Sequence, residues 1–278
     1  MIADIEIINK KPWLSEKFKP SGNSIWHVPT MVTKEEKLML SWLAENYVKG
    51  QGQIVDLGSF LGGSTVFLAD GLNKNKVANK IATKIFCYDV FFIPPRDIHV
   101  IDYFFTKNNI KFPADGNILP LFEKYTSPFK HLIKVNSDRI EKIKVETGDI
   151  ELLFVDIMKS PISYNYIVQE FFSKLIPEQS IVILQDYLYK NSGPWHAILM
   201  EKLSDYFVYI TDTGVNSVVY LNTKPLSKEV LETCIWENIS FEEKISLLEK
   251  AKSKWTLIPQ VEILENQIKR LKSDAFTN

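Results

Sequence analysis

Strand-like segments alternate with helical segments along most of the chain, and this alternation is the feature that most constrains its fold. Five apolar segments read as strands, at 53–57, 84–89, 131–135, 150–155 and 180–184. Strands that alternate with helices form parallel βαβ units in a sheet covered on both faces. Two further strand patterns, "YFVYITD" and "NSVVYLN", are separated only by Thr213, Gly214 and Val215, and they predict an antiparallel hairpin.

The pattern divides the chain into three parts. Residues 1–50 form an irregular, aromatic-rich arm and a helix, for which Thr33 and Glu36 predict a capping box. Residues 51–223 form the α/β domain, with a short helix expected over 137–144 and an insertion at 90–130. Residues 224–278 form a helical extension.

The extension carries an apolar seam at four-three-four-three spacing, made of Leu257, Val261, Leu264, Ile268 and Leu271. The seam has about two heptads, fewer than a coiled coil normally needs. Two interpretations stay open: a helix that docks on its own domain, and a helix that forms a homodimer.

Composition excludes several classes of function. The 278 residues carry a formal net charge of −1, which gives no basic excess for a nucleic-acid backbone. No apolar run approaches the roughly 18 residues of a membrane span. The N-terminus lacks a signal-peptide pattern, and the only cysteines, Cys87 and Cys234, have no metal-type spacing. We therefore expect a cytoplasmic protein without a nucleic-acid or membrane partner.

The sequence "IVDLGSFLGGST", residues 54–65, links the first predicted strand to a helix. A dinucleotide fingerprint that starts at Gly58 needs a glycine where the chain has Phe60, and the lysine of a P-loop is missing. The remaining pattern, Asp56-x-Gly58-x-x-x-Gly62, suits S-adenosylmethionine (SAM), whose carboxylate can meet the amides at the helix start. The alternative is a glycine-rich turn that only packs strand against helix.

A second acid supports the SAM interpretation. The strand "IFCYD" ends in Asp89, where α/β nucleoside sites place the acid that accepts hydrogen bonds from the ribose hydroxyls. An exposed acid at a strand end is the alternative. The predicted cofactor-binding residues are Asp56, Gly58, Ser59, Gly62, Gly63, Ser64, Asp89, Asp138 and Asp156.

These motifs resemble those of class I SAM-dependent methyltransferases, most closely the macrocin O-methyltransferase type, whose members use magnesium. The resemblance covers about residues 33–222 and rests on "IVDLGSFLGGST", "IFCYDVF", "IELLFVDIMKS", "IVILQDYLY" and the helix start Gly193-x-x-x-Ala197. It implies an α/β, Rossmann-like fold with a seven-stranded, mostly parallel sheet. The sheet would end in the C-terminal antiparallel hairpin and carry helical N- and C-terminal additions.

The chain departs from that family where the resemblance implies a metal and a base. The family has Asp-x-Asp after one strand and Asp-Asp-Tyr after a later one, and here these positions read Asp156, Met158, Gln185 and Asp186. By resemblance, Asp156 and Asp186 are the metal ligands, and with Gln185 they could hold Mg²⁺ more weakly than three acids would. Met158 replaces the base and cannot take a proton.

His196 is the substitute base that the sequence offers, because its intrinsic pKa suits proton transfer near neutral pH. Asp156 is the second catalytic candidate, whereas Lys159 is a poor base unless buried. A structural or merely exposed histidine is the alternative. An amine acceptor needs less help from a base, so N-methylation fits Met158 at least as well as O-methylation.

The insertion at 90–130 contains nine phenylalanines and tyrosines. We expect it to cap the acceptor, with Phe91, Phe92 and Arg96 nearest the site. The alternative is a helical cover whose aromatic side chains are buried against the sheet.

The sequence therefore predicts a SAM-dependent methyltransferase that acts on a small molecule, a sugar or secondary metabolite of natural product biosynthesis. The alternative is a non-catalytic module that keeps the SAM fold and serves in binding or assembly. A nicotinamide-dependent oxidoreductase is disfavoured by Phe60.

Overall fold

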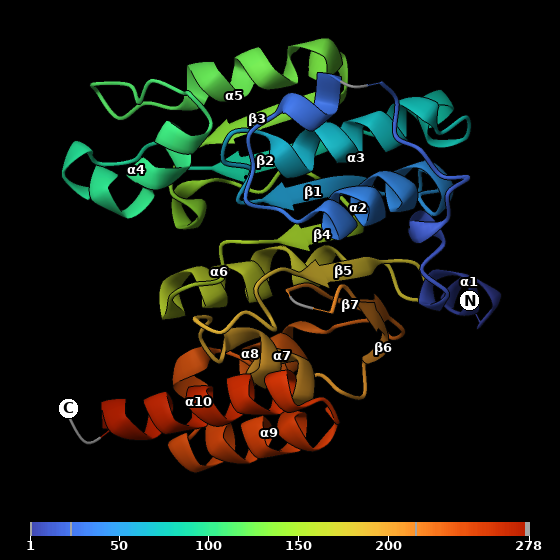
Figure 1. The fold of residues 1–278 in the computed structure, drawn as a ribbon. Coiled ribbons are helices and arrows are strands. Elements are labelled where there is room, and N and C mark those ends of the chain that lie inside the picture. Colours follow the sequence, from blue (N-terminus) through green and yellow to red (C-terminus); the bar gives the residue numbers. More distant parts are fainter. Residues whose placement is uncertain (1, 23, 215, 276–278) are drawn as a thin grey trace. The chain divides into compact units, whose positions relative to one another are not determined.

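The computed structural model describes residues 2–22, 24–214 and 216–275, so Val215 of the predicted hairpin turn lies outside the described residues. Its strands follow the order β3-β2-β1-β4-β5-β7-β6 in a seven-stranded sheet (Figure 1). They are β1 (Gln53–Leu57), β2 (Ile85–Asp89), β3 (Ile133–Ser137), β4 (Ile150–Val155), β5 (Ile181–Leu184), β6 (Phe207–Asp212) and β7 (Val218–Asn222).

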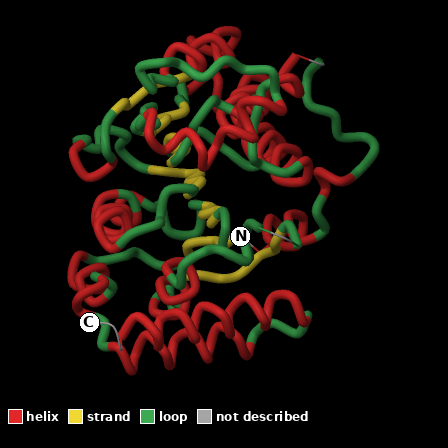
Figure 2. The backbone as a smooth tube through the Cα atoms, turned by 60° about the vertical axis from the view of Figure 1, so that its left-hand side comes forward, coloured by secondary structure: helices red, strands yellow, loops and turns green. Residues whose placement is uncertain are grey.

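Helices precede, connect and follow the strands, and loops and short 3₁₀ turns join them (Figure 2). They are α1 (Ile2–Asn9), α2 (Lys34–Asn46), α3 (Gly63–Lys74), α4 (Ile98–Lys107), α5 (Leu119–Thr126), α6 (Pro161–Glu170), α7 (Trp195–Lys202), α8 (Lys228–Thr233), α9 (Phe241–Ser253) and α10 (Ile258–Ala275). Among the described residues, none of these helices combines the length and the apolar character needed to cross a membrane.

The strand pairings confirm the predicted α/β fold. β1 pairs in parallel with β2, β2 with β3, and β4 with β5. β7 pairs antiparallel with both β5 and β6, which is the predicted C-terminal hairpin. Chain contacts form two compact units, one of residues 11–144 and one of residues 1–10 with 145–278.

In the unit of residues 11–144, α2 packs along α3, and α3 contacts β2. Helix α2 begins at the predicted capping box, in which the Thr33 hydroxyl accepts from the Glu36 amide and the Glu36 carboxylate accepts from the Thr33 amide. The arm before it packs through its aromatic rings. Trp13 lies 6.2 Å from Trp42, and Trp26 lies 4.9 Å from Phe67, between ring centroids.

The capping box gives a first prediction. Replacing Thr33 by alanine leaves first-turn amides of α2 without their acceptor, and we expect the free energy of unfolding to fall by about 1 kcal/mol. Chemical denaturation measures the change. The matched control is Thr106→Ala at an exposed position of α4, where removing a threonine leaves stability unchanged or slightly raised. Equal losses in both variants would contradict the capping role.

Two predicted features are wrong. Ile2–Asn9 of the arm that was predicted to be irregular form the helix α1. The helix expected over 137–144 is only a 3₁₀ turn at Ile140–Lys142. The reason is that β3 extends through Ser137, which pairs with Asp89 of β2, and this pairing takes the first residue of the expected helix. Within the turn only Ile140 is buried, so too little apolar surface is available to stabilise a longer helix.

In the unit that contains residues 145–278, β4 and β5 are buried along their whole length, as expected for parallel strands covered on both faces. A capping box at Ser160 starts α6, although its N3 residue is Ser163 rather than an acid. Helices α9 and α10 lie side by side (Figures 1 and 2). Within the predicted seam, Leu264 and Ile268 are buried while Leu257 is 61% exposed.

The packing of α10 on α9 favours the interpretation in which the seam docks on its own domain. A homodimer through this helix stays a prediction.

Candidate functional site

The glycine loop joins β1 to α3 in the unit of residues 11–144. Gly58 has φ 95° and its amide donates to the carbonyl of Tyr88 at 2.8 Å. Gly62 has φ 90° and occupies the N-cap of α3, where no side chain caps the helix. The first-turn amides of α3 are therefore not engaged by a capping side chain, which is the arrangement that favours an anionic group.

Asp56, the first predicted binding residue, is fully buried in β1, just before this loop. Its carboxylate accepts from the Thr65 hydroxyl at 2.6 Å and from the Ser64 hydroxyl at 2.9 Å. Burial raises the pKa of Asp56 to about 6, and the hydroxyl donors oppose that rise. The carboxylate thus ties β1 to the start of α3, while the Ser59 hydroxyl donates to the backbone carbonyl of Asp56.

Close packing explains the two adjacent glycines of the loop. A Cβ added to Gly62 would lie 2.5 Å from Cγ2 of Thr126, and one added to Gly63 would lie 2.2 Å from Thr30. Real Cβ atoms do not approach so closely, so protein neighbours alone require glycine at both positions. These two residues, considered by themselves, fit the packing interpretation of the loop.

Asp89 joins the glycine loop to the insertion. One of its carboxylate oxygens accepts from the Phe60 amide at 2.9 Å, and the other accepts from the Phe91 amide at 2.7 Å. Both phenylalanines have φ 46°, a left-handed conformation that is uncommon for bulky residues. The motifs that the sequence placed far apart therefore meet at the end of β2. Asp138, by contrast, is exposed, and its carboxylate accepts from the Arg139 amide.

The insertion covers the glycine loop with aromatic rings. The Phe60 ring lies 5.3 Å from that of Phe104 and 6.3 Å from that of Phe105, and Phe91 lies 4.8 Å from Phe122. Phe91, Phe105 and Phe122 are buried. Their burial fits the interpretation of the insertion as a helical cover with buried aromatic side chains. Phe92 is 45% exposed, and the side chain of Arg96 is 86% exposed with Asp97 beside it.

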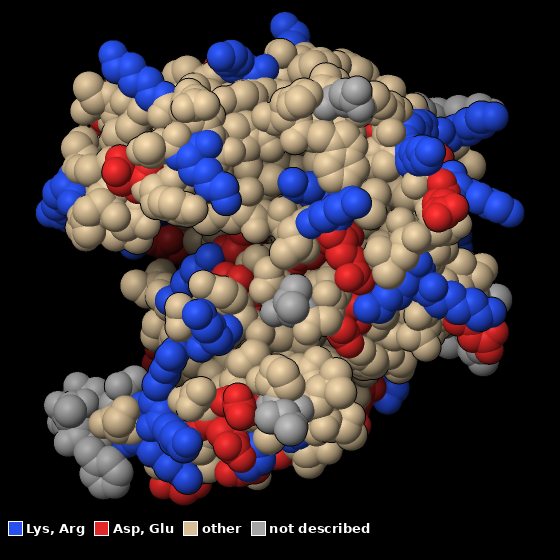
Figure 3. Space-filling view, in the orientation of Figure 1, with Lys and Arg blue, Asp and Glu red and all other residues tan. Residues whose placement is uncertain are grey.

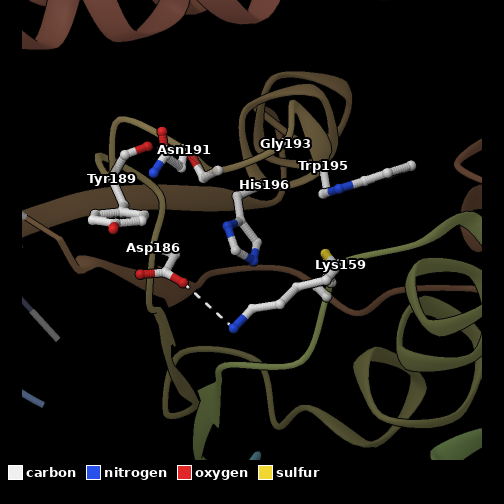
Figure 4. Close-up of a pocket in the computed structure, with 9 residues that line it drawn as sticks. Lys159, Asp186, Tyr189, Asn191, Gly193, Trp195 and His196 are labelled. Carbon is white, nitrogen blue, oxygen red and sulfur yellow. Dashed lines mark hydrogen bonds and ion pairs between the residues drawn. The ribbon is translucent and has the colours of Figure 1, made fainter. Parts of the chain in front are cut away.

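The unit that contains residues 145–278 carries a cavity of about 380 Å³ at the ends of β4 and β5 (Figure 4). This volume suits a small ligand. The lining residues come from the loop after β4, the loop after β5 and the start of α7: Met158, Lys159, Asp186, Tyr189, Asn191, Ser192, Gly193, Trp195 and His196.

Lys159 links the two acids that were predicted to bind a metal. Its Nζ lies 3.0 Å from Oδ1 of Asp156 and 3.5 Å from Oδ2 of Asp186. Although burial acts to lower it, these two carboxylates raise the pKa of Lys159 above its ordinary value. Lys159 is therefore a positively charged group paired with two carboxylates, and not a base.

The predicted magnesium site does not fit this arrangement. An ammonium group takes the position where a cation would bridge Asp156 and Asp186. Within the described parts of the chain, no three His, Cys, Asp or Glu side chains gather in a way that could hold a metal ion.

His196, the predicted base, is buried and faces this cavity (Figure 4). In the described structure neither ring nitrogen has a hydrogen-bond partner, and the ring stacks on Tyr187 with centroids 6.3 Å apart. Burial lowers the pKa of His196 to about 3, and the charge of Lys159 adds to the effect. The imidazole is therefore neutral at pH 7, able to accept or donate one hydrogen bond but weak as a proton acceptor.

The remaining family positions show further departures. Met158 is buried and lines the cavity with a thioether. Gln185 is buried, and its Oε1 has no hydrogen-bond partner among the described residues. Asp186 has φ 63°, a left-handed conformation at the end of β5. A non-glycine residue held there is often found at functional sites.

The sequence did not single out Tyr189, Asn191, Ser192 or Trp195 as lining residues. All four lie between the later acid and His196, in "QDYLYKNSGPW". The sequence feature that could have identified them is a loop rich in polar and aromatic residues directly after a buried strand. Open α/β sheets bind ligands at such loops.

No protein-family model matches the chain, and no curated protein matches it. Among solved structures, it is similar to the calicheamicin methyltransferase CalS11, at 15% identity and a TM-score of 0.48 over 79% of this chain and 91% of that one. The apo structure of CalS11, a TDP-rhamnose 3'-O-methyltransferase, gives 13% identity and a TM-score of 0.49 over 79% and 93%. An O-methyltransferase from Bacillus cereus in complex with SAH gives 11% and 0.41 over 81% and 100%.

Other similar structures are described as RNA methyltransferases. At TM-scores below 0.5 and identities of 15% or less, we draw no functional conclusion from any of them.

Proposed function

We propose that this chain is a SAM-dependent methyltransferase with a small-molecule acceptor. The observation that carries the proposal is the hydrogen bond from the Phe60 amide to the Asp89 carboxylate at 2.9 Å. It brings the glycine loop and the acid at the end of β2 to one place, as a nucleoside site of an α/β sheet requires. The strand order β5-β7-β6, with β7 antiparallel, supports the proposal because the resemblance to class I methyltransferases implied it.

The donor would be held by residues of the loop. The first-turn amides of α3, which have no side-chain cap, suit the methionine carboxylate. Asp89 holds the loop by accepting from the Phe60 and Phe91 amides, and its carboxylate is the group that would accept from the ribose hydroxyls. Asp56 holds the start of α3 in place by accepting hydrogen bonds from the Ser64 and Thr65 hydroxyls. When bound, SAM supplies the sulfonium methyl that is transferred.

The acceptor would occupy the cavity beside His196. The neutral imidazole can hydrogen-bond an acceptor hydroxyl or amine, and the Asp186 carboxylate lines the same cavity as a hydrogen-bond acceptor. Alignment of the acceptor and exclusion of water supply much of the rate in such a displacement. Acidic and basic side chains are mixed on the face drawn in Figure 3, and the net charge is −1, which suits a small acceptor better than a nucleic acid.

Calorimetric titration of SAM into the purified protein tests this function. We expect binding in the micromolar range, and we expect Asp89→Asn to weaken it about tenfold or more, because a carboxylate oxygen that accepts from the ribose is lost. The matched control is Asp102→Asn on the exposed side of α4, which should bind like the wild type. Thermal unfolding without ligand shows whether Asp89→Asn has instead disturbed the loops that Asp89 holds.

A folded protein that binds no SAM would end the enzyme proposal. The second candidate function, a non-catalytic module that retains the fold, would then be favoured. One observation already fits that candidate, since Thr126 and Thr30 require glycine at Gly62 and Gly63 whether or not a ligand binds.

A further inference from the structure

We infer that the acceptor cavity works without a divalent metal, because the ammonium group of Lys159 is a built-in cation between Asp156 and Asp186. The inference depends on the proposed function only in calling the cavity an acceptor site. The cation position itself is a property of the unit that contains residues 145–278, and it can be tested without a methyl donor.

The geometry places one positive charge between two negative ones. The Lys159 Nζ lies 3.0 Å from an Asp156 oxygen and 3.5 Å from an Asp186 oxygen, so it contacts carboxylates from the ends of two neighbouring strands, β4 and β5. Figure 4 shows the Lys159 side chain extended along the cavity with its Nζ directed at Asp186. An ammonium with three donors can serve both acids and still present a donor to a ligand.

A metal would have to displace this ammonium to bridge the same two carboxylates. Magnesium requires near-octahedral oxygen coordination, and the neighbouring family positions offer little further help. Met158 presents a thioether to the cavity, and Gln185 carries only an amide where the family has an acid. The charge of Lys159 is therefore the one that an acceptor oxygen would meet beside Asp186.

The same cation adds to the effect of burial on His196. Burial lowers the pKa of the ring, and the positive charge of Lys159 further disfavours a second positive charge beside it, so the imidazole is neutral. The cavity thus combines a fixed ammonium, a carboxylate and a neutral imidazole, a set suited to an acceptor that carries a hydroxyl or carboxylate oxygen.

Binding of Mn²⁺, followed by electron paramagnetic resonance, tests the inference. The wild type should show no saturable Mn²⁺ binding, whereas Lys159→Met, which removes the ammonium and leaves both acids, should gain affinity of about tenfold or more. Adding Asp186→Asn to Lys159→Met should abolish the gain. Lys190→Met is the matched control, because it removes an exposed lysine of the next loop without touching the pair.

Two outcomes would overturn the inference. Equal Mn²⁺ affinity in the wild type and in Lys159→Met would mean that the lysine yields its position to a metal. No binding in folded Lys159→Met would mean that the two acids form no cation site. Circular dichroism establishes folding, and Lys159→Gln replaces the methionine variant if that variant does not fold. Neither outcome depends on SAM, so failure here is distinguishable from failure of the proposed function.

Discussion

Replacing Gly71 by alanine is expected to lower the free energy of unfolding by about 3 kcal/mol or more, or to prevent folding of residues 11–144. The added Cβ would lie 2.0 Å from the carbonyl oxygen of Ser41 and 2.9 Å from Cβ of Ala44. The nearest of these atoms belongs to the backbone of α2, so no side-chain rotation can relieve the contact. The two helices would have to separate, and their packing would be lost with them.

Chemical denaturation of Gly71→Ala measures this effect, with Asn73→Ala as the matched control. Asn73 is exposed near the end of the same helix, so alanine there changes helix propensity without adding a Cβ where Gly71 meets Ser41. A loss below about 1 kcal/mol in Gly71→Ala would show that the two helices do not pack as closely as described.

The second large effect concerns Asp56 and the pH dependence of stability. Burial raises its pKa from 3.8 to about 6 in the folded state, so the folded protein binds this proton more tightly than the unfolded chain does. The corresponding stabilisation is fully present below the unfolded pKa and is lost as pH rises through about 6. A shift of about two units corresponds to about 3 kcal/mol.

Asp56→Asn removes this titration while an amide oxygen still accepts from Ser64 or Thr65. We therefore expect the stability of the wild type relative to the variant to rise by about 3 kcal/mol as pH falls from about 7 to about 3. Denaturation curves at several pH values measure it. Asp102→Asn, which removes an exposed carboxylate, should run parallel to the wild type. Parallel curves for Asp56→Asn would refute the buried titration.

The sequence predicted the strands well because each is a short apolar run bounded by loops, as "LLFV" and "IVIL" show for β4 and β5. The prediction of a helix over 137–144 failed because Ser137 pairs with Asp89 in the sheet, and this pairing overrides the local helix pattern. That pairing joins residues far apart in the chain, and no local pattern reports it.

The sequence predicted which residues form the candidate site better than it predicted what each of them does. Asp156, Asp186 and His196 were selected from the motifs, and the structure brings Asp186 and His196 to one cavity. Lys159 was considered only as a poor base. Its place between two acids depends on how the loops after β4 and β5 approach each other, and spacing along the chain carries no such information.

The left-handed backbone of Asp186 has an evolutionary consequence. Glycine adopts φ near 63° without strain, so the backbone at this position favours a mutation to glycine wherever the carboxylate has no use. Codons for the two residues can differ by a single base, which puts that change within easy reach of drift. If related sequences keep aspartate at this position, selection acts on its carboxylate. If they carry a mixture of glycine and asparagine instead, the cavity no longer has a function that needs the carboxylate.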